Sequence, residues 1–330
     1  MAQEGWISGT AHAAGGSRNY KLWVPATLEK GNASPLVMML HGCRHDAKDM
    51  AEISGMNEVA EVNRFLVVYP EQSRLANLMK CWNWFKPKHQ ARDAGEPSIL
   101  AAVVDQVRST HHVDPDRVYV AGVSAGGAMA SILGATYPDL FAAIAVFAGA
   151  EFKAATSIFE GLAAMERGGP DPIHQGQLAF EAMKSSLVHK KKRRLPAIVF
   201  HGTADTRVSP VNAEQTITQW RKTNACLAAE HSESSFALTE KVIGGQVPDG
   251  YAYRKHIYVE ADARPLLEKW LVQGLGHAWS GSPNPSKYSD PKGPNASAEI
   301  WRFFCEAGSN PTDSLSSPDS LHRESSETMK

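Results

Sequence analysis

The chain has 330 residues, with 34 Lys and Arg against 35 Asp and Glu. The formal net charge of −1 gives no reason to expect nucleic acid as a partner, and the basic run at residues 190–194 is expected to solvate a loop. No apolar stretch is long enough to cross a bilayer, and no signal peptide is visible at the N-terminus. On these grounds the chain is either cytoplasmic or has lost a leader.

Apolar runs and helical spacing predict the elements in chain order. Strands are predicted at residues 20–24, 36–40, 65–69, 117–121, 141–147, 197–200, 254–259 and 266–272. Helices are predicted at residues 46–63, from residue 97 onward, and at residues 127–133, 213–222 and 297–307. The alternation of strands and helices predicts an α/β fold, with a mostly parallel central sheet and helices on both faces.

One segment breaks this alternation. Residues 151–194 are rich in glycine and proline, with helical patches at 158–165 and 178–187, and are expected to form a cap-like insertion over the site. From residue 308 the chain holds almost no large apolar side chain, which predicts a disordered tail at 308–330. We therefore expect a single catalytic domain at residues 1–307.

The most informative motif is Gly122-Val123-Ser124-Ala125-Gly126, set between a predicted strand and a predicted helix. A Gly-x-Ser-x-Gly sequence in this setting is typical of the nucleophile elbow of the α/β-hydrolases. The turn is so sharp that only small residues fit two positions on either side of the serine. A glycine-rich turn with an incidental serine is the alternative interpretation.

A serine hydroxyl needs a general base, and the base needs an orienting carboxylate; in the α/β-hydrolases these follow in the order Ser, Asp or Glu, His. Asp205 comes directly after the strand at 197–200, where open α/β sheets place their sites. Asp249 and Asp262 are the next candidates for the acid.

The chain has 13 histidines, and His277 is the preferred base because glycines precede it in Gly274-Leu275-Gly276-His277. A structural loop histidine is the alternative. The spacing of histidines and cysteines shows no zinc pattern, so no metal is expected.

An oxyanion hole requires two backbone N–H groups. One is expected from Ala125, directly after the nucleophile, and the other from Cys43, in the loop at 41–44 after the strand at 36–40.

With these residues in place, the chain resembles the short-chain polyhydroxyalkanoate (PHB) depolymerase and esterase family of the α/β-hydrolase superfamily, and is similar to feruloyl and acetylxylan esterases. The resemblance extends from about residue 20 to residue 304. It rests on Leu40-His41-Gly42-Cys43, Tyr69-Pro70-Glu71, Cys81-Trp82-Asn83-Trp84-Phe85, Gly95-Glu96-Pro97, residues 122–127, residues 202–205 and residues 276–279.

The resemblance implies a secreted serine esterase, extracellular or periplasmic, that acts on ester or polyester substrates without a cofactor. It also implies a disulfide between Cys43 and Cys81 that pins the oxyanion loop, with two buried thiols as the alternative. The remaining cysteines, Cys226 and Cys305, are then expected to form a second pair. The four cysteines by themselves allow three pairings.

Two departures from the family pattern bear on function. His45 stands where the family usually has glutamine, which puts the local support of the oxyanion loop in doubt. Nothing after residue 308 resembles a polymer-binding domain, which favours hydroxyalkanoate oligomers, amorphous polyester or short-chain esters as substrates.

Aromatic side chains near the site residues could form walls for an acyl or alkoxy chain. Trp279, Trp82 and Trp84 are expected to contact substrate, with core packing as the alternative. The sequence thus predicts a serine ester hydrolase of the PHB depolymerase type. A feruloyl or acetylxylan esterase is the enzymatic alternative, and a polymer- or carbohydrate-binding protein is the non-enzymatic one.

Overall fold

A computed structural model describes residues 5–29, 31–186, 194–230, 236–262 and 264–308 of the chain. The predicted tail after residue 308 and residues 190–193 of the basic run lie outside the described residues.

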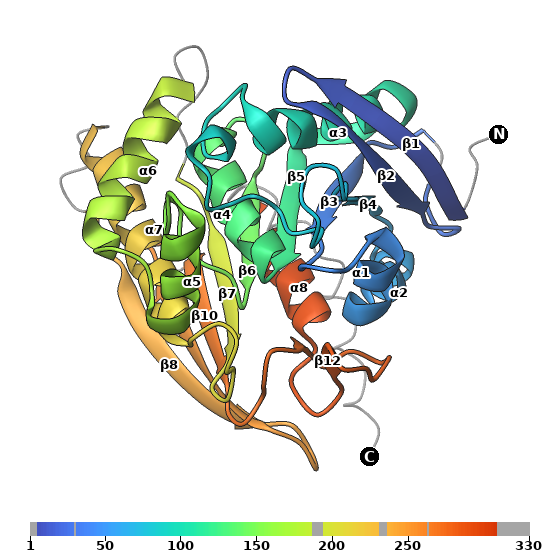
Figure 1. Cartoon of the computed structure of the whole chain (residues 1–330). Coiled ribbons are helices and arrows are strands. Elements are labelled where there is room, and N and C mark those ends of the chain that lie inside the picture. Colours follow the sequence, from blue (N-terminus) through green and yellow to red (C-terminus); the bar gives the residue numbers. More distant parts are fainter. Residues whose placement is uncertain (1–4, 30, 187–193, 231–235, 263, 309–330) are drawn as a thin grey trace, which may run out of the picture.

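The central sheet has ten described strands in the order β1-β2-β4-β3-β5-β6-β7-β10-β9-β8 (Figure 1). Neighbours from β4 to β10 in this order run parallel, whereas β1 and β2 at one edge and β9 and β8 at the other pair antiparallel. The strands are β1 (Gly5–Ala13), β2 (Gly16–Val24), β3 (Ser34–Leu40), β4 (Leu66–Pro70), β5 (Val113–Val123), β6 (Ala143–Phe147), β7 (Ala197–Gly202), β8 (Thr239–Gln246), β9 (Ala252–Val259) and β10 (Pro265–Val272). This sheet confirms the predicted α/β-hydrolase architecture.

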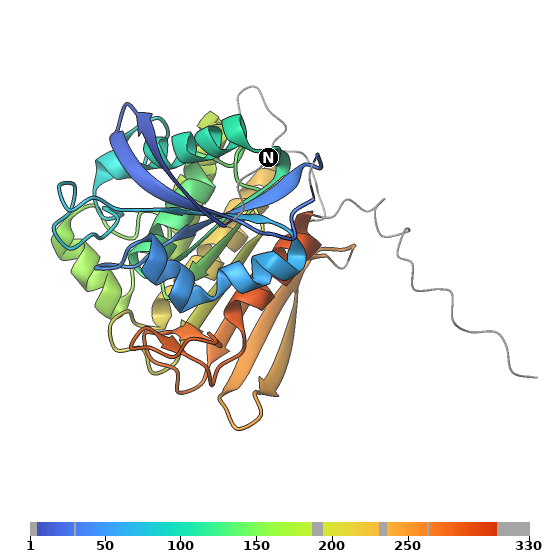
Figure 2. The same ribbon diagram turned by 90° about the vertical axis from the view of Figure 1, so that its right-hand side faces the viewer.

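Helices cover both faces of the sheet (Figures 1 and 2). One face packs against α1 (Ala47–Ser54), α2 (Met56–Asn63) and α8 (Ala296–Gly308). The other packs against α3 (Gly95–Thr110), α4 (Ala125–Thr136), α6 (Pro172–Ser186) and α7 (Val211–Glu230). The strands between them are apolar on both sides: in β3, Leu36 and Met38 join one core cluster and Val37 joins the other. A continuous apolar run is the expected sequence of such a doubly covered strand.

The predicted insertion contains two described helices, which have different positions. Helix α5 (Ile158–Arg167) contributes side chains to the cavity described below. Helix α6 instead packs on α4 and α7, so it extends the helical layer. The part of the insertion that lines this cavity is therefore α5.

The structure differs from the predicted elements in places where the local sequence gives only a weak signal for secondary structure. The predicted helix at 46–63 is divided by Gly55, whose φ of 60° ends α1 and begins α2. Strand β8 was not predicted because it lies at the sheet edge with nearly all its residues exposed, and therefore lacks an apolar periodicity. The short pair β11 (Trp279–Ser280) and β12 (Ser289–Asp290) and the 3-10 turn η1 (Pro87–His89) were also not predicted.

Glu151 is an unusual buried acid at the start of the insertion. It is 1% exposed, and neither of its carboxylate oxygens has a hydrogen-bond partner in the described structure. Burial, together with the negative charge of Asp171, raises the pKa of Glu151 to about 8. The folded protein therefore favours the protonated form of this side chain.

This shift predicts a pH-dependent stability. Because the pKa of Glu151 is higher in the folded chain than in the unfolded chain, the contribution of Glu151 to the free energy of unfolding should fall as pH rises from about 4.5 to about 8. Each unit of pKa difference corresponds to about 1.4 kcal/mol. Glu151→Gln should remove this slope, which thermal unfolding over this pH range would measure. An equal slope in the variant would contradict the assignment.

Candidate active site

Ser124 lies in a strained turn between β5 and α4. Its φ of 58° is in the left-handed region that favours glycine, and its N–H donates to Phe147 O over 2.9 Å. A Cβ atom on Gly122 would lie 2.3 Å from Gly126 O, and one on Gly126 would lie 2.2 Å from Leu40 O. Because neither backbone oxygen can give way by that much, only glycine fits at either position. The motif therefore has the strand–turn–helix setting that a nucleophile elbow requires.

Asp205 and His277 meet at the ends of two neighbouring parallel strands. Asp205 follows β7 and His277 follows β10, and His277 Nδ1 lies 2.7 Å from Asp205 Oδ2. The other carboxylate oxygen, Oδ1, accepts from the backbone N–H groups of Arg207 and Val208 over 2.9 and 3.0 Å. These bonds fix the carboxylate while it faces the imidazole.

The protonation of this pair follows from its surroundings. Burial would raise the pKa of the Asp205 carboxyl, but hydrogen bonds from His201 and His277 outweigh burial and hold that pKa well below its usual range. An ionised carboxylate only accepts hydrogen bonds, so His277 Nδ1 must carry the proton. His277 Nε2 is then available as an acceptor.

Ser124 and His277 line the same cavity. The hydrogen bond between the Ser124 hydroxyl and His277 Nε2 is not formed in this conformation. Such bonds are often long in a free enzyme and tighten when substrate binds, so the arrangement is compatible with general-base catalysis.

The loop after β3 lies directly against the nucleophile. A Cβ atom on Gly42 would be 3.5 Å from Ser124 Cβ. The backbone N–H of Cys43, the next residue, has no acceptor in the described part of the chain. Ala125 is the first residue of α4, and first-turn N–H groups have no partner within their own helix. Both amides are thus available to bind an oxyanion.

A disulfide joins Cys43 to Cys81, as predicted, with a Cα–Cα distance of 4.2 Å. His45, the departure from the family pattern, packs edge-on to Tyr288 with ring centroids 4.4 Å apart. Burial lowers the pKa of His45, so a neutral imidazole occupies this position beside the oxyanion loop.

A buried polar network supports the disulfide loop. Glu96, fully buried in the first turn of α3, accepts from Asn83 N over 2.7 Å and pairs with Arg18 over 3.2 Å. Gln72 connects this network to both sides of the site, because its side chain donates to Cys81 O and its backbone N–H donates to His41 Nε2, each over 3.0 Å. Sequence reasoning missed Arg18 and Gln72, and used Glu96 only as part of a family motif.

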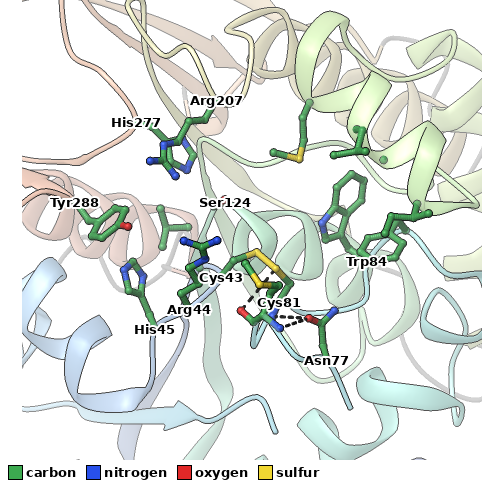
Figure 3. Close-up of a pocket in the computed structure, with 18 of the residues that line it drawn as sticks. Cys43, Arg44, His45, Asn77, Cys81, Trp84, Ser124, Arg207, His277 and Tyr288 are labelled. Carbon is green, nitrogen blue, oxygen red and sulfur yellow. Dashed lines mark hydrogen bonds between the residues drawn. A yellow bond between two sulfur atoms is a disulfide. The ribbon is translucent and has the colours of Figure 1, made fainter. Parts of the chain in front are cut away.

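The site residues open into a cavity of about 620 Å³ with mainly apolar walls (Figure 3). Helix α5 contributes one wall through Ile158, Leu162 and Met165, and Trp84 and Phe85 form another. Trp84 is therefore placed where the sequence predicted a substrate contact.

Trp279 and Trp82 are placed differently from the prediction. Both are fully buried and neither lines the cavity, so they cannot contact substrate in this conformation. Trp279 stacks on Phe147 at 4.7 Å and donates to Ser297 Oγ, which in turn donates to Ser54 O. Trp279 therefore anchors the segment that follows His277 to the end of α1.

The predicted bond between Cys226 and Cys305 is wrong. The structure forms no disulfide between them: Cys226 is on α7, where its Sγ lies 3.3 Å from Gln177 Oε1, and Cys305 is on α8. Helices α7 and α8 lie on opposite faces of the sheet, which separates the two thiols. In the part of the chain that the structure describes, no group of three or more His, Cys, Asp or Glu side chains could hold a metal ion.

The fold and the elbow place the chain among the α/β-hydrolases, and sequence comparison gives the family. Residues 18–242 match the model of the family described as Esterase PHB depolymerase. The chain belongs to this family, which confirms the resemblance seen in the sequence.

Individual relatives span both substrate types considered above. Poly(3-hydroxyalkanoate) depolymerase C of Paucimonas lemoignei is 34% identical over 74% of this chain, which covers only 55% of the length of that depolymerase. Feruloyl esterase B of Thermothelomyces thermophilus is 27% identical, over 78% of this chain and 82% of the relative. Acetylxylan esterase A of Emericella nidulans is 28% identical, over 61% of this chain and 66% of the relative.

Solved structures support the fold. An acetyl xylan esterase from Aspergillus awamori has a TM-score of 0.67 at 20% identity, over 91% of this chain and 99% of its own. A feruloyl esterase module from Clostridium thermocellum has a TM-score of 0.55 at 12% identity, over 91% of this chain and 87% of its own.

The disulfide yields a stability prediction. Because it closes a loop of 38 residues, the chain-entropy model gives it about 4 kcal/mol. The double variant Cys43→Ser/Cys81→Ser should lose about that much free energy of unfolding in a denaturant titration. Cys226→Ser, which removes a thiol outside the disulfide, is the control. A double variant as stable as this control would contradict the prediction.

Proposed function

We propose that the protein is a serine carboxylic-ester hydrolase with Ser124 as nucleophile, His277 as general base and Asp205 as the orienting acid. The observation that carries the proposal is the 2.7 Å hydrogen bond between His277 Nδ1 and Asp205 Oδ2 beside the cavity that Ser124 lines. Membership of an esterase family supports the same assignment.

The proposed reaction proceeds through an acyl-enzyme. His277 Nε2 takes the proton of the Ser124 hydroxyl as its oxygen attacks the ester carbonyl carbon. The backbone N–H groups of Cys43 and Ala125 bind the oxyanion of the tetrahedral intermediate. His277 then protonates the leaving alkoxide, and a water molecule releases the acyl group from Ser124 by the same steps.

The proposed substrates are hydroxyalkanoate oligomers, amorphous polyester or short-chain esters. The apolar walls that Trp84 and α5 provide suit an aliphatic acyl or alkoxy chain. The relative with 34% identity is named a poly(3-hydroxyalkanoate) depolymerase, which favours this class. A feruloyl or acetylxylan esterase is the second candidate, because relatives and a solved structure of those names cover most of the chain.

We further propose that the protein acts in an oxidising compartment, extracellular or periplasmic, because the Cys43–Cys81 disulfide lies beside the proposed oxyanion hole. Among the described helices, none combines the length and the apolar composition of a membrane span. The two-sided core supports one catalytic domain within residues 1–307.

The acid assignment predicts a specific loss of turnover. Asp205→Asn should lower kcat by roughly 10⁴-fold, because the amide would stabilise the wrong imidazole tautomer. Steady-state hydrolysis of a p-nitrophenyl ester would measure it, with Ser124→Ala as the inactive reference. Of the other two candidate acids, Asp249 lies in the turn between β8 and β9 and Asp262 pairs with Arg264, so Asp262→Asn is a matched control. Full turnover in Asp205→Asn would refute the assignment.

The substrate class can be tested with a panel of a 3-hydroxybutyrate oligomer, a triglyceride of butyric acid, methyl ferulate and acetylated xylan. We expect the oligomer to give the highest kcat/KM, with products identified by mass. Ser124→Ala should abolish each activity and labelling by a fluorophosphonate. A higher kcat/KM on methyl ferulate or acetylated xylan would favour the second candidate.

A further inference from the structure

The cavity beside Ser124 carries two arginines that the proposed ester chemistry does not use. Arg44 comes from the loop after β3, next to Cys43, and Arg207 comes from the loop after β7. Both side chains are exposed and line the cavity, which they approach from opposite sides (Figure 3). An ester bond is uncharged, so two cations beside it indicate a second, anionic group on the ligand.

Neither guanidinium is neutralised by the protein: among the described residues, neither Arg44 nor Arg207 forms an ion pair. Near Arg44, Asp46 caps α1 and lies 3.7 Å from Lys80 Nζ. Glu166 lines a neighbouring depression together with Arg207 but does not pair with it.

Asp205, the acid nearest to Arg207 in the sequence, also has hydrogen-bond partners other than the Arg207 side chain. The Asp205 carboxylate takes its hydrogen bonds from His201, His277 and backbone N–H groups, including that of Arg207 itself. The Arg207 side chain instead lies 5.9 Å from the ring centroid of Tyr288. Its positive charge is therefore available to a ligand.

The position of Arg207 indicates which half of the substrate, the acyl or the alcohol half, lies beside it. The backbone N–H of Arg207 donates to the Asp205 carboxylate, which binds His277. The Arg207 side chain therefore projects from the backbone beside the general base. Since His277 would protonate the leaving alkoxide, the alcohol half of the ester must lie on this side of the cavity. Arg44, next to Cys43, flanks the same opening from the oxyanion side.

We propose that Arg44 and Arg207 bind a free carboxylate on the alcohol half of the substrate, so that the enzyme prefers esters whose leaving group is a hydroxy acid. This inference rests on the proposed ester hydrolysis and specifies its substrate class. In a linear oligomer of 3-hydroxy acids, the last ester has such a leaving group, with the carboxyl carbon three bonds from the ester oxygen. Hydrolysis breaks the acyl–oxygen bond; water supplies the hydroxyl of the new acid and a proton for the alkoxide, and a hydroxy acid is released from the carboxylate end.

Arginine suits this role because its planar guanidinium can form two parallel hydrogen bonds to a carboxylate. Neutral acetyl esters and methyl ferulate offer no such group. The two arginines therefore also distinguish the depolymerase-type function from the second candidate.

The experiment compares the linear dimer of 3-hydroxybutyrate with the same dimer whose acid end is converted to the primary amide. The ester bond is the same in both, and only the charge of the leaving group differs. We expect the natural enzyme to prefer the acid dimer about tenfold in kcat/KM, the size expected for hydrogen bonds to a charged group. In Arg44→Gln/Arg207→Gln this ratio should fall close to one. Arg254→Gln, which removes an exposed charge on β9 outside the cavity, should retain the ratio.

The outcomes separate the inference from the proposed function. Equal hydrolysis of both dimers by the natural enzyme, or an unchanged ratio in the double variant, overturns the arginine assignment while ester hydrolysis stands. Failure to hydrolyse either dimer, together with cleavage of methyl ferulate or acetylated xylan, overturns both the arginine assignment and the proposed hydroxyalkanoate substrates and favours the second candidate. Failure to hydrolyse any of these esters overturns the proposed ester hydrolysis itself. Fluorophosphonate labelling of Ser124 in each variant verifies that the site has folded.

Salt provides a second readout that a purely structural role would not change. Raising the ionic strength from about 0.01 M to about 1 M shortens the Debye length from about 30 Å to about 3 Å. The preference for the acid dimer should decline over this range, whereas hydrolysis of the amide dimer should show no comparable decline. A preference that is insensitive to salt would count against charge recognition at these exposed side chains.

Discussion

The close approach of two backbone segments is the constraint on which the site depends. Gly126 lies so near Leu40 O that any side chain at this position would push the elbow away from the end of β3. The same contact brings Gly42 against Ser124, and the next residue, Cys43, lines the cavity with the nucleophile. The strained φ of Ser124 and the proposed oxyanion hole are therefore two results of one packing requirement.

The charged groups at the site are of two kinds. Those in the interior are buried and have partners in the protein, whereas those at the rim of the cavity are exposed. The Glu96 network is buried and its charge is paired with Arg18, so it holds the disulfide loop in place. Asp205 is held by backbone donors and faces His277. At the rim, by contrast, Arg44 and Arg207 are exposed and without an ion pair among the described residues, which is the condition in which a charge is available to a ligand.

The central strands and the candidate triad could be predicted because each depends on local sequence: an apolar run followed by a small or polar residue at the strand end. The buried network could not, since Arg18, Gln72 and Glu96 are distant in the chain and carry no common motif. Proximity in sequence misled the interpretation of Trp279, which lies two residues after His277 but turns into the core. The pairing of Cys226 with Cys305 failed because counting cysteines does not reveal which face of the sheet each helix covers.

The anchoring of Trp279 bears on the order in which the site residues are synthesised. Trp279 reaches the end of α1 through Ser297, so a residue that follows β10 is fixed by one that precedes the elbow in the chain. A ribosome-bound chain that has emerged only as far as α7 contains the elbow and Asp205 but not the imidazole that would activate the serine. Under the proposed mechanism, the general base therefore joins the nucleophile and the acid only after β10 has been synthesised.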